Sequence, residues 1–231
     1  MLLNDFFDLN DPFTNLYSKD TPLWSPLIDI KNLFKDLGNI EIDIPKGVVL
    51  ENPELISIGK GTVVEPGAYI KGPCIIGENC ELRTNAYIRG FVWTGNNCII
   101  GHCTEVKNSI LFDGAKAAHF AYVGDSILGK GVNLGAGVKC ANYRFDEKPV
   151  IININEAKYP TSLKKMGAIL GDFVQVGCNS VLSPGSLLAK GCICYPCINI
   201  SGFYPRDSRI KTQEKNAHIR SSLSSSLQEK S

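Results

Sequence analysis

The amino-acid sequence repeats with a period of six residues over two long stretches. Mostly aliphatic side chains recur at every sixth position, and in the first stretch a small or slender side chain follows four places after each. An α-helix needs a period near 3.6 and a single strand needs a period of two, so neither explains the pattern as one continuous element. The period fits a solenoid of short strands and tight corners, with three strands closing a coil of eighteen residues. The repeat positions are Ile58, Val64, Ile70, Ile76, Leu82, Ile88, Thr94, Ile100 and Val106, then Leu170, Val176, Leu182, Leu188 and Cys194.

The repeat divides the chain into three parts. Residues 1–48 do not follow it, and we expect a helical cap there, because Ser25 and Pro26 supply a helix start and apolar residues recur at helical spacing up to Gly38. This helix is expected to cover the first coil, whose strand edges would otherwise be open. Residues 49–205 form the expected solenoid domain, and the polar residues 206–231 a frayed tail.

The six-residue pattern is interrupted twice inside the solenoid. It stops from Phe112 to Val123, resumes through Leu128 and Leu134, and stops again from Ala141 to about residue 167. A long insertion in a compact repeat is usually functional, and we interpret residues 144–168 as an inserted, projecting loop or hairpin. Loops on a rigid scaffold are free to carry polar groups, so the chemistry is expected at these two interruptions.

Composition excludes several classes of function. The net charge is +1 and the pI about 7.5, so no strong field attracts nucleic acid or an acidic membrane. No apolar run approaches a membrane-spanning length, and the first residues lack the basic and apolar blocks of a secretory signal. We therefore expect a cytoplasmic protein.

The nine cysteines do not resemble a disulfide framework. Cys74, Cys80, Cys98 and Cys192 occupy the small position of the repeat, where a free thiol behaves as a small apolar side chain. Cys192, Cys194 and Cys197 suggest zinc only weakly, because no second Cys/His pair follows at finger spacing. We expect core thiols and no metal site.

Among the three histidines, His119 has the most suggestive position. His218 lies in the polar tail and His102 at a corner, whereas His119 lies in the first interruption, before Phe120, Ala121 and Tyr122. It is either a solvated surface residue or a general base, since imidazole titrates near neutrality and accepts a proton from an amine.

Several motifs at consistent spacing carry a resemblance to a known family. They are the stretch from His119 to Asp125, the Gly129–Gly137 segment with Asn133, Gly135 and Ala136, and Ala141-Asn142-Tyr143. Over roughly residues 50 to 205 the chain resembles the acetyltransferase half of bifunctional N-acetylglucosamine-1-phosphate uridyltransferase/glucosamine-1-phosphate acetyltransferases, and the archaeal-type sugar-1-phosphate enzymes most closely. The resemblance implies an all-β fold, a left-handed parallel β-helix of hexapeptide repeats.

The resemblance also implies an activity and a set of site residues. The reaction is acetyl transfer from acetyl-CoA to an amino-sugar 1-phosphate, most simply glucosamine 1-phosphate, in UDP-N-acetylglucosamine and cell-wall biosynthesis. It requires no metal, and His119 is the implied base. The implied acceptor-binding residues are Arg89, Lys107, Tyr122, Asn133, Asn142, Tyr143 and Lys148, and the implied coenzyme-binding residues are Ala136 and Cys178. Arg89 suits bidentate phosphate binding, while the lysines act as point charges.

The chain departs from the family at several points. Cys178 stands where the bacterial enzymes have a serine, and Arg206 and Lys211 are only candidates for the nucleotide end of the coenzyme. The first 45 residues cannot hold a nucleotidyltransferase domain, so we expect no uridyltransferase activity from this chain. The family builds its sites between neighbouring subunits, so a homotrimer is expected, and the 144–168 segment is expected to extend across an interface.

Other functions fit the same solenoid. One is acyl transfer from a carrier protein to a nucleotide-linked amino sugar, and another is a non-catalytic scaffold or regulatory subunit. A zinc carbonic anhydrase needs three converging histidines, but only His102 and His119 lie in the solenoid. Each residue also has a structural alternative: Arg89 and Lys107 could be ordinary solvated side chains, and Asn133 could turn a corner.

Overall fold

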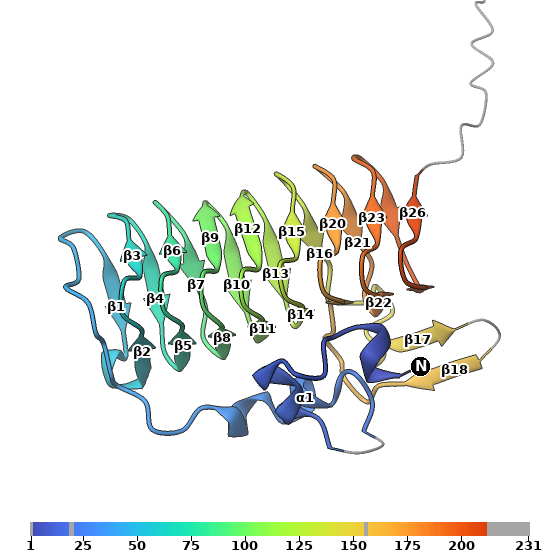
Figure 1. Cartoon of the computed structure of the whole chain (residues 1–231), viewed down its shortest axis with the longest axis horizontal. Coiled ribbons are helices and arrows are strands. Elements are labelled where there is room, and N and C mark those ends of the chain that lie inside the picture. Colours follow the sequence, from blue (N-terminus) through green and yellow to red (C-terminus); the bar gives the residue numbers. More distant parts are fainter. Residues whose placement is uncertain (1, 19–20, 155–156, 212–231) are drawn as a thin grey trace, which may run out of the picture.

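The computed structural model describes residues 2–18, 21–154 and 157–211, and it is dominated by one parallel β-solenoid (Figure 1). Three eight-stranded parallel sheets form its three faces. The left-handed parallel β-helix expected from the sequence is therefore confirmed.

We call the faces sheets 1, 2 and 3, in the order in which the chain visits them. Sheet 1 contains β1 (Val49–Glu51), β4 (Tyr69–Lys71), β7 (Tyr87–Ile88), β10 (Glu105–Lys107), β13 (Tyr122–Gly124), β16 (Lys139–Cys140), β21 (Val181–Leu182) and β24 (Asn199–Ile200). Sheet 2 contains β2 (Ile56–Ile58), β5 (Cys74–Ile76), β8 (Val92–Thr94), β11 (Ser109–Leu111), β14 (Ile127–Leu128), β19 (Ala168–Leu170), β22 (Ser186–Leu188) and β25 (Phe203–Tyr204). Sheet 3 contains β3 (Val63–Val64), β6 (Glu81–Leu82), β9 (Ile99–His102), β12 (Lys116–His119), β15 (Asn133–Leu134), β20 (Gln175–Val176), β23 (Ile193–Cys194) and β26 (Arg209–Ile210).

The repeat positions of the sequence form the core of the solenoid. Ile70, Ile88 and Ile100 are fully buried, and the small positions, including Cys74 and Cys98, fill the space between them. Burial raises the pKa of the Cys74 and Cys194 thiols to about 12, which keeps them protonated and unreactive. The expectation that these cysteines are core residues is confirmed.

The prediction that the solenoid is interrupted from Phe112 to Val123 is wrong, because the coil continues through this segment. The chain from Phe112 to Val123 forms β12 and most of β13, and Ala117 and Val123 are buried at the inward position. The pattern only shifts by one residue. Cys80 and Thr62, on adjacent coils, are 18 residues apart, whereas Ser126 and Ser109 are 17 apart. The shortened coils have one residue fewer at the corner between sheets 1 and 2. In the segment that follows, alanines occupy buried positions that larger aliphatic residues fill elsewhere.

The second expected interruption is confirmed as an insertion containing a hairpin. Ser126 and Ala168 lie on adjacent coils but are 42 residues apart in sequence. Within the insertion β17 (Ile151–Ile154) and β18 (Ala157–Pro160) pair antiparallel. Val150 and Ile152 are buried, which fastens the base of the hairpin to the solenoid side.

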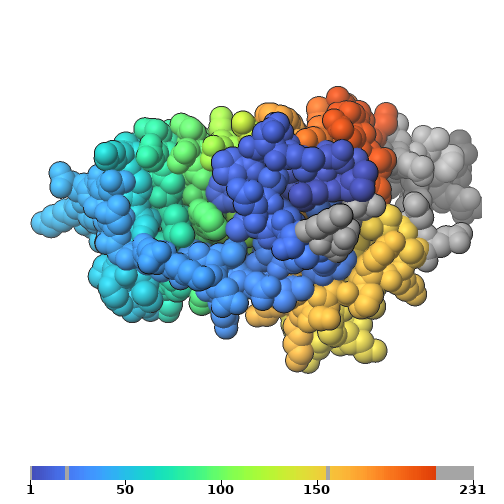
Figure 2. Space-filling view, turned by 60° about the horizontal axis from the view of Figure 1, so that its bottom comes forward, coloured from blue at the N-terminus to red at the C-terminus, as the bar shows by residue number. Residues whose placement is uncertain are grey.

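The N-terminal segment lies along the outer face of sheet 2 and not over the first coil, so that part of the expectation is wrong. The segment contains one helical turn, α1 (Ser25–Ile28), and three 3₁₀ turns, η1 (Leu3–Asp5), η2 (Pro12–Leu16) and η3 (Ile30–Leu33). A fourth 3₁₀ turn, η4 (Pro53–Leu55), belongs to the solenoid. We call residues 2–34 the strap. Figure 2 shows it in blue across several coils, bordering the yellow insertion.

A second apolar core explains the position of the strap. Several sheet 2 strands carry apolar residues that point outward, such as Ile110, Ile127 and Ile169, and Phe6 and Phe7 of the strap pack in the same buried cluster. Their burial outweighs the helical periodicity of residues 30–37, which η3 follows only as far as Leu33. The first coil is instead contacted by Ile40, Ile42 and Ile44.

Candidate active site

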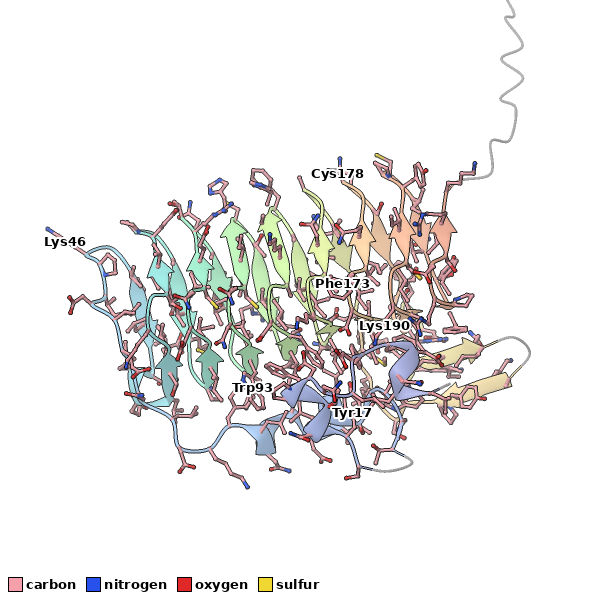
Figure 3. All side chains as sticks on the ribbon, in the orientation of Figure 1. Tyr17, Lys46, Trp93, Phe173, Cys178 and Lys190 are labelled. Carbon is pink, nitrogen blue, oxygen red and sulfur yellow. The ribbon has the colours of Figure 1, made fainter. Side chains whose placement is uncertain are left out.

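Three of the predicted site residues lie on successive coils at one corner of the solenoid. We call the corner between sheets 3 and 1, where His119 ends β12, the histidine corner. The N–H of Gly137 donates to the His119 carbonyl (3.0 Å), the N–H of Asn179 to that of Ala136 (2.8 Å), and the N–H of Cys197 to that of Cys178 (2.9 Å). These bonds stack His119, Ala136 and Cys178 in one line. Figure 3 places Cys178 at the edge of the solenoid opposite the strap.

His119 itself is exposed at the surface of the histidine corner. Its strand neighbour on the preceding coil is His102. The His102 Nδ1 atom lies 3.0 Å from the Thr84 carbonyl, and its ring packs edge-on against Phe120 at 5.3 Å. Among the described residues, the His119 imidazole has no hydrogen-bond partner. It is therefore accessible to a ligand, whereas the His102 ring is already held by the protein.

The corner also offers a backbone donor suited to a carbonyl oxygen. The N–H groups of Gly135 and Gly137 donate to backbone carbonyls of adjacent coils, but within the described part of the chain the N–H of Ala136 between them does not. Such a donor could stabilise negative charge on the oxygen of an acyl group. This geometry fits a thioester carbonyl beside His119.

A second group of predicted residues lies on sheet 1 and at its corner with sheet 2, which we call the aspartate corner. Lys107 Nζ lies 2.7 Å from Asp125 Oδ2, and both side chains are nearly buried, with exposures of 12% and 10%. Asn142 donates from Nδ2 to the Tyr122 hydroxyl (3.2 Å) and, through a very short contact, to Asp125. Lys107, Tyr122 and Asn142 are thus brought together by a carboxylate.

Sequence reasoning missed Asp125, although the residue lies inside a motif that carried the resemblance. Its carboxylate accepts from Lys107, Asn142 and the Asn108 amide, the last at 3.0 Å. Asn108 and Asp125 lie at the two shortened corners and both adopt positive φ, 44° and 50°. The five-residue spacings from Val106 to Leu111 and from Val123 to Leu128 are the signal that could have found them.

Like Lys107, the predicted phosphate ligand Arg89 forms an ion pair with a carboxylate of the protein. Its Nη1 lies 2.6 Å from Glu105 Oε1, and its guanidinium lies 5.8 Å from the Tyr87 ring centroid. This pair is more exposed than that of Lys107, with 44% and 32% of the side chains accessible. The guanidinium has five N–H donors, so it retains donors for a ligand.

The electrostatics of Tyr122 favour a neutral hydroxyl. Burial is the largest influence and raises the pKa of this phenol, and the nearby charge of Asp125 acts in the same direction. Tyr122 therefore keeps its proton and remains a hydrogen-bond donor.

Of the remaining predicted residues, Asn133 and Lys148 do not join these groups within one chain, whereas Tyr143 borders the aspartate corner. Asn133 lies on sheet 3, paired in register with Lys116 and Gln175. Lys148 is exposed in the insertion, where its backbone N–H faces Asp146 at 3.4 Å. Tyr143 is 44% exposed at the start of the insertion. The histidine and aspartate corners are opposite edges of sheet 1.

Three further observations concern membrane spans, metal clusters and cysteines among the described residues. None of the helices described is long and apolar enough to cross a membrane. No group of three or more His, Cys, Asp or Glu side chains in the described ranges could hold a metal ion. Of the cysteines once weighed as zinc ligands, Cys192 and Cys194 are buried, and Cys192 Sγ lies 3.1 Å from the Pro205 carbonyl.

The fold and the corner histidine define a hexapeptide-repeat protein of the left-handed β-helix class. Within that class the chain belongs to the family described as the GMPPB C-terminal domain, whose model matches residues 70–202.

The chain is also similar to individual relatives and solved structures. The chain is 40% identical over 124 residues to the "Bifunctional protein GlmU" of Methanococcus maripaludis, covering 51% of this chain and 30% of the relative. It is 36% identical over 164 residues to the "Bifunctional sugar-1-phosphate nucleotidylyltransferase/acetyltransferase" of Sulfurisphaera tokodaii, covering 70% and 39%. The chain thus spans between 30% and 39% of the length of these relatives. Among solved structures, the UDP-N-acetylglucosamine acyltransferase from Campylobacter jejuni matches with a TM-score of 0.42 at 17% identity, covering 70% of this chain and 68% of that one.

Proposed function

We propose that this chain is an acetyl-CoA-dependent N-acetyltransferase that acts on an amino-sugar 1-phosphate, with glucosamine 1-phosphate as the first acceptor to test. The observation that carries the proposal is the line of His119, Ala136 and Cys178 on successive coils. An accessible imidazole one coil away from a backbone N–H suited to a thioester carbonyl supports acyl transfer at this corner. The names of the archaeal relatives support the same class of reaction.

The proposed chemistry assigns one task to each part of the site. His119 takes a proton from the acceptor ammonium or from the amine as it attacks the acetyl carbonyl carbon. The Ala136 N–H donates to the carbonyl oxygen as negative charge develops there. The carbon–sulfur bond then breaks, giving the amide and the coenzyme thiol. Arg89 and Lys107 face the acceptor phosphate, and no metal takes part.

The proposal includes the setting of the reaction. The product belongs to UDP-N-acetylglucosamine biosynthesis in the cytoplasm, and the active form is a homotrimer. A trimer would let Asn133, Tyr143 or Lys148 of one subunit approach the histidine corner of another. We assign no uridyltransferase step to the β-helix, and pyrophosphate release from UTP and N-acetylglucosamine 1-phosphate would contradict that part.

A thiol-release assay tests the proposal. Protein mixed with acetyl-CoA and glucosamine 1-phosphate should release free thiol, and His119→Ala should lower that rate by at least about a hundredfold. His102→Ala is the matched control, because His102 occupies the same corner one coil earlier. It should retain most of the activity. Absence of thiol release with every hexosamine phosphate would contradict the proposal, and it is the result that a non-catalytic scaffold predicts. Full activity of His119→Ala would contradict the role of His119 as the base.

A second candidate is acyl transfer to a nucleotide-linked amino sugar. The exposed corner that carries Ala136 and Cys178 does not by itself limit the length of the acyl chain. The donor decides between the two: faster transfer from an acyl carrier protein than from acetyl-CoA would favour the second candidate.

A further inference from the structure

A pocket of about 490 Å³ adjoins the aspartate corner on the side of the strap. Three segments far apart in sequence meet there. The strap contributes Lys31, the aspartate corner contributes Asn108 and Asp125, and the two ends of the insertion contribute Tyr143 and the pair Lys164–Lys165. We call it the lysine pocket. None of its lysines was singled out as a site residue from the sequence.

The charge of the lysine pocket is positive. Lys31, Lys164 and Lys165 are exposed, and within the described ranges none of them forms an ion pair with a carboxylate. The one acidic residue in the lining is Asp125, whose charge is balanced by Lys107 at 2.7 Å. Three lysines therefore line the pocket without an ion-pair partner among the described residues, which favours a negatively charged occupant.

Two of the lysines are held in place by aromatic rings. Lys165 Nζ lies 5.9 Å from the Tyr143 ring centroid, and Lys31 Nζ lies 5.8 Å from that of Phe91. An aromatic face attracts an ammonium group without neutralising its charge. The Lys165 contact keeps this ammonium group beside a ring that lines the pocket, whereas Phe91 is not among the lining residues.

The backbone around the pocket is also fixed. Tyr143 and Lys165 form an antiparallel bridge, and the Met166 N–H donates to the Asn142 carbonyl at 2.9 Å. These contacts close the base of the insertion. On the other side, Leu27 and Ile30 of the strap are buried and hold Lys31 at the rim.

We propose that the lysine pocket binds the phosphate or diphosphate group of a small molecule. The ammonium groups supply charge and the Tyr143 hydroxyl supplies a further donor. By contrast, Arg89 and Lys107 already have carboxylate partners at 2.6 and 2.7 Å. The pocket lies at the edge of sheet 1 opposite His119, so binding there can be measured without acetyl transfer, although Tyr143 and Asp125 connect it to the residues assigned to the acceptor.

Direct binding of inorganic pyrophosphate and inorganic phosphate, measured by titration calorimetry, tests the proposal. Wild-type protein should bind at least one of them at millimolar concentration or below, and added salt should weaken binding. The triple variant Lys31→Gln, Lys164→Gln, Lys165→Gln should bind at least about tenfold more weakly. The control triple variant Lys46→Gln, Lys60→Gln, Lys116→Gln removes the same charge from exposed lysines elsewhere and should bind normally.

The binding results can be distinguished from the results of the acetyl-transfer assay. Tighter binding of pyrophosphate than of phosphate would identify a diphosphate-bearing ligand, and equal binding a phosphomonoester. His119→Ala should bind both probes like the wild type, whatever its activity. No binding at millimolar concentration would overturn the proposal. Equal weakening by the pocket and control variants would also overturn it, because charge alone would then explain binding.

Discussion

Asp125 connects more of the predicted site than any residue selected from the sequence. Its carboxylate holds Lys107, Asn108 and Asn142, and the Asp125 side chain is only 10% exposed. A nearly buried charge is stable only when its partners satisfy it, and removing one partner leaves the other uncompensated. The position of Asn142 beside Tyr122 therefore depends on Asp125.

Replacing Asp125 by asparagine tests this dependence. Asparagine has the same shape and tolerates the positive φ of 50° at this corner, so the change removes the charge alone. We expect a loss of about 3 kcal/mol in the free energy of unfolding, because Lys107 stays nearly buried without a counter-ion. Urea unfolding measures it. The double variant Asp125→Asn, Lys107→Met should recover part of the loss, whereas additive losses would show that the pair is not coupled.

At the scale of elements, the strap is fastened to the solenoid by one buried carboxylate. Asp172, of which 1% of the side chain is exposed, accepts the N–H groups of Asp8 (2.7 Å) and Lys130 (2.9 Å). The Asp172 N–H in turn donates to the Phe6 carbonyl at 2.8 Å. Lys190 Nζ is more distant, at 3.7 Å. Burial is the largest influence on Asp172 and raises the pKa of this carboxyl above its ordinary value of 3.8.

This raised pKa predicts a pH dependence of stability. The folded protein keeps the Asp172 proton to a higher pH than the unfolded chain does. The contribution of Asp172 to the free energy of unfolding therefore falls as the pH rises from 3.8 through the folded pKa, and is constant above it. Urea unfolding of wild type and Asp172→Asn at a series of pH values isolates this contribution. A wild-type advantage that grows with pH in this window would contradict the prediction.

The placement of the strap shows where sequence reasoning was limited. The six-residue period identified the buried positions because one inward residue per strand is a local property of the coil. The outward residues Ile110, Ile127 and Ile169 were just as apolar, but the sequence does not say which distant segment buries them. The helical spacing near Ile30 suggested a cap on the first coil, whereas the segment packs against the outward apolar residues of sheet 2.

The candidate site shows the same difference between local features, which the sequence predicts, and contacts between distant segments, which it does not. The resemblance placed His119, Ala136 and Cys178, and the backbone bonds between successive coils put them on one corner. The partners of Lys107 and Arg89 could not be predicted, because they lie across coils and depend on the register. A coil shortened to 17 residues is what sets Asp125 opposite Lys107, and it appeared in the sequence only as a break in the pattern.

At the scale of the whole molecule, the three faces of the solenoid are not equivalent. The strap and the base of the insertion cover sheet 2 over much of its length, while sheets 1 and 3 carry exposed apolar side chains such as Val63 and Val181. The histidine corner lies between these two open faces. Phe120, at that corner, is 53% exposed. An assembly that used the open faces would therefore place His119 at a subunit boundary.

Light scattering tests the predicted trimer and its location. The wild type should have about three times the chain mass of 25.2 kDa under conditions of thiol release. Phe120→Asp should lower that mass, because aspartate tolerates positive φ but opposes burial. Phe173→Asp is the control, since Phe173 is also exposed (58%) with positive φ, at the corner between sheets 2 and 3. A monomeric wild type would exclude the trimer, and an equal effect of both variants would exclude the histidine corner as its boundary.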